Sequence, residues 1–193
     1  MIIKDKSKLQ EKCSPVSVKE GEEIGVRLLH ELRNSDNGIG LAANQIGINK
    51  RVCVINVKEP IVLINPEIIE KSKEQFVFPE GCLSFPDDKI RTKRNVSITV
   101  KADNHEEQLS FSAESKNVND AFECVCVQHE IDHLDGITMF DREFKSEPIV
   151  NGVNAPKKIG RNTKVLIYKD NKTKEIKFKK FDKFKKEGWA LTS

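Results

Sequence analysis

The nine residues QHEIDHLDG, at positions 128–136, contain two of the chain's four histidines, four residues apart, with a glutamate directly after the first. On a helix, residues i and i+4 lie one turn apart on the same face, so His129 and His133 can point toward one ion while Glu130 borders that face. This His-Glu-x-x-His pattern is typical of zinc hydrolases. The alternative is a solvated, charged helix whose histidines bind nothing.

The residues before the histidines favour a buried helix, which we expect from Asp120 to about Leu134. The run AFECVCV (121–127) is apolar at nearly every position, a pattern expected of a helix that other elements surround. Asp120 and Glu123 fit a capping box at its start, and Gly136 fits the left-handed residue that ends a helix. Histidines and a carboxylate are costly in a core unless they are paired or ligated, so burial favours the metal site.

The rest of the chain predicts a second helix and two pairs of strands. Apolar residues recur at helical spacing from Ser17 to about Arg33. RVCVINV (51–57) and IVLINPEII (61–69) are rich in β-branched residues and predict paired strands. NVSITVKAD (95–103) and EQLSFSAES (107–115) alternate polar and apolar residues and predict a hairpin.

Composition excludes several classes of protein. Charged residues make up 33% of the 193 residues and hydrophobic ones 37%, and no apolar run approaches the roughly 18 residues that a membrane span needs. The N-terminus carries no signal-peptide pattern, so we expect a soluble, cytoplasmic protein that does not bind a membrane. Five cysteines are an odd number, which argues against a disulfide framework and favours a metal ligand or a reactive thiol.

The charge is distributed unevenly along the chain. Residues 151–193 hold 12 Lys and 1 Arg against 2 Asp and 2 Glu, a net charge of +9, while residues 1–150 have a net charge of −6. The turn-rich NGVNAPKKIGRN (151–162) predicts a joint between the two parts. We therefore predict an acidic domain over 1–150 and a basic extension over 151–193, with a β-hairpin formed by 163–170 and 174–181.

Two other stretches bear on the site. EGCLSFP (80–86) places Cys82 in a glycine-flanked, turn-like segment, whereas the cysteines at 13, 53 and 124 are assigned to core packing. Cys126 is assigned to core packing as well, although its position three residues before His129 would also let it line the pocket. GIGLAANQIG (38–47) has glycines that let a backbone run close to a ligand. It lacks the lysine of a phosphate-binding loop, and its ordinary structural meaning is a glycine-rich turn into a strand.

Together, GIGLAANQ, EGCLS and QHEIDH, in this order and at these separations, resemble peptide deformylase, the enzyme that removes the formyl group from the N-terminal methionine of new bacterial-type polypeptides. The resemblance covers roughly residues 1–148 and implies an α+β fold, with antiparallel strands packed around the central helix that carries the two histidines. The substrate would be N-formylmethionyl nascent peptides, the product would include formate, and we expect a monomer.

The resemblance implies a role for each matching residue. Cys82, His129 and His133 would ligate one divalent metal, Fe(II) in the cell with Zn(II) or Ni(II) as possible substitutes, and leave a position open for water. Glu130 would transfer the proton. Gln45 and the backbone N–H of Leu83 would meet the developing oxyanion.

The resemblance also implies the residues that bind the substrate. Ile39 and Gly40 would pair with its backbone, with Gly38 keeping that edge accessible. The other implied substrate-binding residues are Phe78, Glu80, Gly81, Arg94, Phe122, Val125 and Cys126. Phe78 and Phe122 are bulky for a methionine pocket.

The basic extension is expected to contact ribosomal RNA through its charge, although its lysines also fit a strand edge that they merely keep soluble.

Two rival functions remain open at this point. Another His-Glu-x-x-His metallopeptidase would usually take its third ligand from a downstream His or Glu, but no histidine follows His133. A non-catalytic homologue that binds nascent chains would not need Gln45, Cys82 and Glu130 together.

Overall fold

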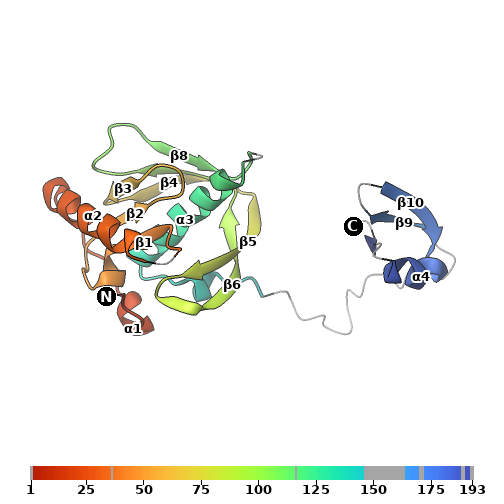
Figure 1. The fold of residues 1–193 in the computed structure, drawn as a ribbon. Helices are drawn as coiled ribbons and strands as arrows, with labels where there is room; N and C mark the ends of the chain where they lie inside the picture. The colour runs from red at the N-terminus through yellow and green to blue at the C-terminus, as the bar shows by residue number, and fades with distance from the viewer. Residues whose placement is uncertain are drawn as a thin grey trace. The chain divides into compact units, whose positions relative to one another are not determined.

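The computed structural model describes residues 2–35, 37–115, 117–145, 164–169, 172–187 and 190–191. The chain divides into two compact units, Met1–Phe144 and Lys145–Ser193. The larger unit has a mixed α+β fold in which antiparallel sheets surround the helix α3, Val118–Leu134, as the sequence predicts (Figure 1). None of the described helices has the length and apolar character that crossing a membrane requires.

One sheet is buried on both faces. Its order is β1-β2-β3, with bounds Gly40–Ala42, Val52–Ile55 and Ile61–Ile64. Along β2 the side chains of Val52 and Val54 join the core beneath α2, whereas Cys53 and Ile55 join the core around α3. Successive strand residues face opposite sides, so a strand covered on both faces is apolar at every position instead of alternating.

Helix α2, Val18–Arg33, covers the outer face of this sheet and confirms the prediction of an amphipathic helix. Ser17 is its N-cap, and the Ser17 side chain accepts a hydrogen bond from the N–H of Glu20. Leu28 and Leu32 are buried against the sheet. The helix therefore fixes one side of the β1-β2-β3 sheet, and α3 fixes the other.

The remaining strands of the larger unit form two more sheets. One has the order β4-β7-β8, with bounds Glu67–Lys71, Ser97–Lys101 and Leu109–Ser112, and the other pairs β5, Gln75–Cys82, with β6, Phe85–Asn95. The pairing of β7 with β8 confirms the predicted hairpin. The prediction of one strand over 61–69 is wrong. The left-handed φ of 49° at Asn65, followed by Pro66, ends β3 and sends β4 into another sheet.

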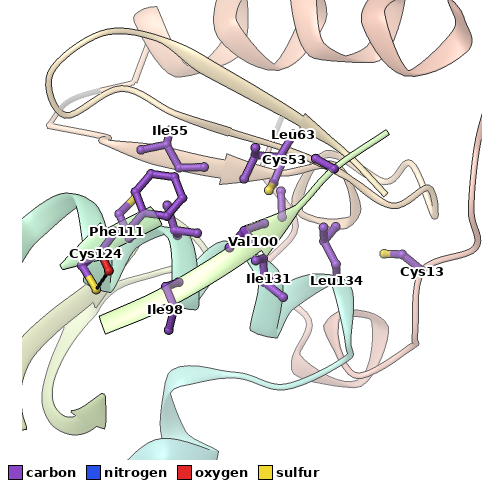
Figure 2. Close-up of a cluster of buried hydrophobic side chains, with 14 residues drawn as sticks. Cys13, Cys53, Ile55, Leu63, Ile98, Val100, Phe111, Cys124, Ile131 and Leu134 are labelled. Atoms are coloured by element: carbon purple, nitrogen blue, oxygen red, sulfur yellow. Dashed lines mark hydrogen bonds between the residues drawn. The ribbon is translucent and has the colours of Figure 1, made fainter. Parts of the chain in front are cut away.

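The main core lies between α3 and the sheets. Ile131 and Leu134 of α3 share one buried cluster with Leu63 of β3 and Val100 of β7 (Figure 2). Twelve consecutive residues of α3, from Glu123 to Leu134, are buried. This confirms the predicted burial of the helix and shows that its histidines lie in the interior.

The ends of α3 differ in how well the sequence predicted them. The predicted capping box is wrong, because Asn117 is the N-cap, while Asp120 lies in the first turn and pairs with Lys58 at 2.9 Å. Gly136 has a φ of 74°, which confirms the left-handed stop. The N–H groups of Gly136 and Ile137 donate to the carbonyls of His133 and Asp132, which completes a Schellman motif.

Short elements complete the larger unit: the helix α1 and the 3₁₀ turns η1 and η2, with bounds Lys6–Leu9, Ala43–Ile46 and Met139–Arg142. In the second unit, β9 pairs antiparallel with β10 and β11, and η3 and α4 follow β10. The bounds are Lys164–Lys169, Lys172–Lys177, Ala190–Leu191, Phe178–Lys180 and Phe181–Lys186. The predicted joint over 151–162, and with it the domain boundary at residue 150, lies outside the described residues.

Gly136→Ala tests how tightly the end of α3 is packed. A Cβ at Gly136 would lie 2.4 Å from the backbone oxygen of Gln10, on top of the strain of a positive φ. Gly47, at φ +80°, is the matched control, since its nearest neighbour would be 3.9 Å away. We expect Gly136→Ala to lower the free energy of unfolding by about 3 kcal/mol or more and Gly47→Ala by about 1 kcal/mol. Urea denaturation followed by circular dichroism measures both, and equal losses would contradict the close packing.

Candidate metal centre

Cys82 reaches the site from the last position of β5. It is opposite Phe85 of β6, and the register shifts between Gly81 and Cys82, directly before the turn at Leu83 and Ser84. A register irregularity at a strand end commonly re-aims a side chain. The thiol is thus held at the junction of strand and turn, against the helix that carries the histidines.

Three ligand atoms converge between β5 and α3. Among the described residues, Cys82, His129 and His133 form the group suited to a metal, with ligand atoms within 4.8 Å of one another. The Nε2 atom of His133 lies 3.1 Å from the Nε2 of His129 and 3.3 Å from the Sγ of Cys82. Ligands around a tetrahedral zinc ion are separated by about 3.3–3.6 Å, given Zn–N and Zn–S bonds of about 2.0 and 2.3 Å. The three donors therefore have nearly the spacing that one ion requires.

Glu80 fixes the tautomer of His129. Its Oε2 lies 2.7 Å from the Nδ1 of His129. Burial alone would raise the pKa of Glu80, but hydrogen bonds from Arg94 and His129 hold it well below its usual range. Because Glu80 is ionised, Nδ1 of His129 carries the proton and donates it. The Nε2 lone pair of His129 then points toward Cys82 and His133, as a metal ligand requires.

The electrostatics of the site favour a bound cation. Burial opposes a charge on His129, yet contacts with Cys82 and Glu80 raise its pKa well above the ordinary value. Burial and the neighbouring His129 lower the pKa of His133 well below its ordinary value. One imidazole is thus surrounded by anions while protonation of the other is suppressed. A single divalent cation bound to both rings and to the thiolate satisfies this arrangement.

Glu130 is a buried carboxylate beside these ligands. It is 4% exposed, and its Oε2 has no hydrogen-bond partner among the described residues. Burial raises the pKa of Glu130 to about 7. A Cβ at Gly40 would lie 2.5 Å from Oε1 of Glu130 and 2.5 Å from Sγ of Cys126. Because Gly40 has no side chain, Glu130 and Cys126 can occupy this space.

The GIGLAANQ segment supplies two further polar contacts through η1. The Oε1 of Gln45 accepts a hydrogen bond from the N–H of Ala42 at 2.8 Å, so its amide nitrogen faces Cys82 Sγ at 3.4 Å and Ser84 Oγ at 3.1 Å. The neighbouring Asn44 donates from Nδ2 to the carbonyl of His133 at 2.7 Å. The segment thus points a donor at the metal site and also anchors the helix end.

An open cleft of about 450 Å³ reaches these groups. Gln45, Cys82, Leu83, His129 and Glu130 line it. Nine of the ten predicted substrate-binding residues line it as well: Gly38, Ile39, Gly40, Phe78, Glu80, Gly81, Phe122, Val125 and Cys126. The rings of Phe78 and Phe122 meet edge to face, 5.1 Å apart. Their contact forms an aromatic wall on one side of the cleft.

Arg94 is the exception among the ten predicted substrate-binding residues. It is 3% exposed and does not line this cleft, because its guanidinium binds Glu80 and Asp132. Arg94 instead borders a second, polar cleft of about 750 Å³, which Asp132 and Arg142 also line. Its burial and its ion pairs make it a support for Glu80.

Sequence reasoning missed four polar residues that brace the site: Asn44, Ser84, Asp132 and Arg142. The sequence could have indicated a supporting role for Asp132, because an acid between the two histidines of a buried helix needs a cationic partner. Arg142 follows the helix by several residues, and neither periodicity nor spacing distinguishes it from a surface arginine.

Comparison with known proteins gives the family of the chain. The family model for polypeptide deformylase matches residues 1–148. The chain is 44% identical over 144 residues to a peptide deformylase of Heliobacterium modesticaldum, which covers 72% of this chain and 90% of that protein. It is 51% identical over 108 residues to a peptide deformylase of Natranaerobius thermophilus, covering 54% of this chain and 65% of that protein.

Solved structures give the same result. The peptide deformylase of Thermotoga maritima is similar with a TM-score of 0.62 and 34% identity, covering 72% of this chain and 92% of that one. A deformylase of Acinetobacter baumannii with bound Met-Ala-Ser has a TM-score of 0.63 and 29% identity, covering 74% and 96%. Both likenesses extend over most of the solved chains and leave part of this chain unmatched.

Glu80→Gln tests the support of His129. A neutral amide cannot hold the Nδ1–H of His129 as a carboxylate does, so we expect the affinity for Zn(II) to fall about 10- to 100-fold, the usual cost of losing such a partner. Glu123→Gln is the matched control, because Glu123 is a similarly buried acid on α3 whose carboxylate pairs with Lys58 at 2.6 Å. Competition with a chromophoric chelator measures the dissociation constants. Equal affinities for the two variants would rule out the role of Glu80.

Proposed function

The chain belongs to the peptide deformylase family and is a metal-dependent enzyme that removes the N-formyl group from newly made polypeptides, and on this premise we propose how its residues carry out the reaction. The observation that carries the proposal is the convergence of Cys82, His129 and His133 on one point, with Glu130 and Gln45 at the same cleft. A divalent cation held by the three ligands would acidify a water molecule and polarise the formyl oxygen. We propose Fe(II) as the ion in the cell, with Zn(II) or Ni(II) able to replace it, because a thiolate and two imidazoles suit all three.

Glu130 is the proton carrier in this proposal. It accepts a proton from the attacking water and later delivers it to the departing amine of methionine, so that formate and a free N-terminus are released. A pKa near 7 suits a group that must take up and return a proton at neutral pH. The absence of a partner at Oε2, among the described residues, leaves that oxygen available for the transfer.

Gln45 stabilises the negative oxygen that develops on the formyl carbon. Because Ala42 holds the amide oxygen of Gln45, the amide nitrogen stays aimed at the metal site and needs no reorientation during the reaction. We assign the backbone N–H of Leu83, in the turn after Cys82, as the second donor. Loss of one such donor typically lowers the rate by about 100-fold or more.

The substrate backbone adds to the open edge of β1. The carbonyl of Ile39 already accepts from the N–H of Asn56 at 2.8 Å, toward β2. Neighbouring residues in a strand turn their backbone groups to opposite sides, so Gly40 turns its N–H and C=O toward the open edge. We therefore propose Gly40 as the backbone partner of the substrate and the half-exposed Ile39 side chain as an apolar contact.

The methionine side chain fits the apolar part of the cleft. Phe78, Phe122, Val125 and Cys126 line it, and a thioether packs favourably on aromatic rings. The Acinetobacter baumannii relative binds Met-Ala-Ser. We propose that the same peptide sequence, with a formyl group on its methionine, is a substrate of this chain.

Formate release from formyl-Met-Ala-Ser tests the function, and Glu130→Gln tests the mechanism. The variant keeps the three ligands, so we expect it to retain metal while turnover falls at least about 100-fold. Activity of the parent enzyme requires ionised Glu130, so kcat/KM should rise with pH through a limb at or below about pH 7, because a nearby cation lowers the pKa of a carboxylate that is otherwise about 7. No formate from the metal-loaded parent protein would overturn the function, and near-normal turnover of Glu130→Gln would overturn the role of Glu130.

We also propose that the basic second unit draws the enzyme to ribosomal RNA. Eight of its described lysines are exposed: Lys145, Lys174, Lys177, Lys179, Lys180, Lys183, Lys185 and Lys186. The last three lie in the short helix α4, and Lys179 and Lys180 directly precede it. Lysines that neutralise phosphates give binding that is independent of sequence and weakens steeply with salt. Such binding would bring the active site near emerging nascent chains.

Charge substitution tests this proposal without removing the unit. Changing Lys179, Lys180, Lys183, Lys185 and Lys186 to Gln should sharply reduce co-sedimentation with ribosomes at low salt and should leave hydrolysis of formyl-Met-Ala-Ser unchanged. The control changes four exposed lysines of the larger unit, Lys4, Lys6, Lys8 and Lys12, to Gln. Unchanged co-sedimentation of the first variant, or an equal loss in the control, would overturn the proposal.

A further inference from the structure

A chain of buried ion pairs leads away from the metal ligands. Glu80, which holds His129, also accepts from Arg94 through Nε at 2.6 Å and Nη2 at 2.9 Å. The remaining arm of Arg94 donates to Oδ2 of Asp132. Asp132 in turn is bound by Arg142, from Nε at 3.0 Å and from Nη2 at 2.7 Å. Four charged side chains thus connect the Nδ1 of His129 to the second, polar cleft.

The charges in this chain balance only when both arginines are present. Glu80 and Asp132 are two buried carboxylates, 6% and 8% exposed, and they share Arg94, which is 3% exposed. Arg142 engages both oxygens of Asp132, a bidentate geometry that offsets its charge. Without Arg142, one buried guanidinium would have to balance two buried carboxylates, and an uncompensated buried charge is costly.

Without Arg142, Glu80 and Asp132 would compete for Arg94, and this competition would affect the metal site. As Asp132 drew Arg94 toward itself, the two bonds from Arg94 to Glu80 would weaken. Glu80 would then hold the Nδ1–H of His129 less firmly, and the ring would be less well oriented for a metal.

We propose that Arg142 is a positioning residue of the metal centre, acting through Asp132, Arg94 and Glu80 on His129. The inference rests on the proposed function only in taking His129 as a ligand. The Arg142 side chain is 44% exposed and does not contact the ligand atoms itself. Its position at the end of η2, against β6, makes the segment after α3 part of the support for the metal.

Arg142→Met provides the test, with Lys58→Met as the matched control. Lys58 is 41% exposed and binds two carboxylates of α3, Asp120 and Glu123, at 2.9 and 2.6 Å, but it is not connected to the ligands. We expect the dissociation constant for Zn(II), measured by chelator competition, to rise about tenfold in Arg142→Met, at the low end of the range for outer partners of a ligand. The dissociation constant should stay within about twofold in Lys58→Met, because Lys58 is not connected to the ligands. The ion pairs of Lys58 are about as exposed as that of Arg142, so the two variants lose comparable interactions.

Asp132→Asn in the Arg142→Met background separates positioning from a general loss of structure. Neutralising Asp132 removes the competition for Arg94, so Zn(II) affinity should return to within about threefold of the parent, although the double variant has lost one more charged group. If Arg142→Met does not fold, Arg142→Lys replaces it. Lysine keeps the charge but loses the fork, and an increase of about threefold is expected.

Unchanged Zn(II) affinity in the Arg142 variant would overturn the proposal, as would a loss that Asp132→Asn does not reverse. Formate release by the parent enzyme is measured separately. Failure of that assay would overturn the proposed function and leave the metal-binding comparison intact.

Discussion

The site depends on the burial of α3 with its polar residues inside. Two histidines and an aspartate cannot stay in a core without partners, because each loses its contact with water. The surrounding elements supply them: β5 brings Cys82 and Glu80, η1 brings Asn44 and Gln45, and β6 brings Arg94. The elements around the helix therefore do more than cover it, since they also carry the charges and hydrogen-bonding groups that offset the cost of burying its polar residues.

The roles of neighbouring acids are separated by their surroundings. Glu80 accepts from Thr92, Arg94 and His129 and stays ionised, whereas Glu130 is buried, lacks a partner for Oε2 among the described residues, and has its pKa raised to about 7. In the proposed mechanism, one carboxylate thereby fixes a ligand and the other exchanges protons. The environments differ because Arg94 bonds directly to Glu80, whereas Glu130 lies against Gly40, which has no side chain to offer it a partner.

Strong local patterns made much of the fold predictable. The apolar run before His129, the left-handed stop at Gly136 and the alternation in 95–115 each correspond to an observed element. Predictions failed where the outcome depended on a competing partner. Asp120 looks like a cap in the sequence but binds Lys58, so Asn117 takes that position. The position of Arg94 also depends on a partner that the sequence does not reveal, because the structure places it away from the cleft and bound to Asp132, which the pattern of the helix does not pair with it.

The contact between Gly40 and the catalytic side of α3 also limits how this sequence can evolve. Every amino acid within one base change of a glycine codon has a Cβ, and at this position a Cβ would meet both Cys126 and Glu130 at 2.5 Å. A single point mutation at position 40 therefore cannot leave the carboxylate of Glu130 where it is. A smaller residue at position 126 would relieve only the contact with Sγ of Cys126, so a side chain at position 40 would still displace the carboxylate of Glu130.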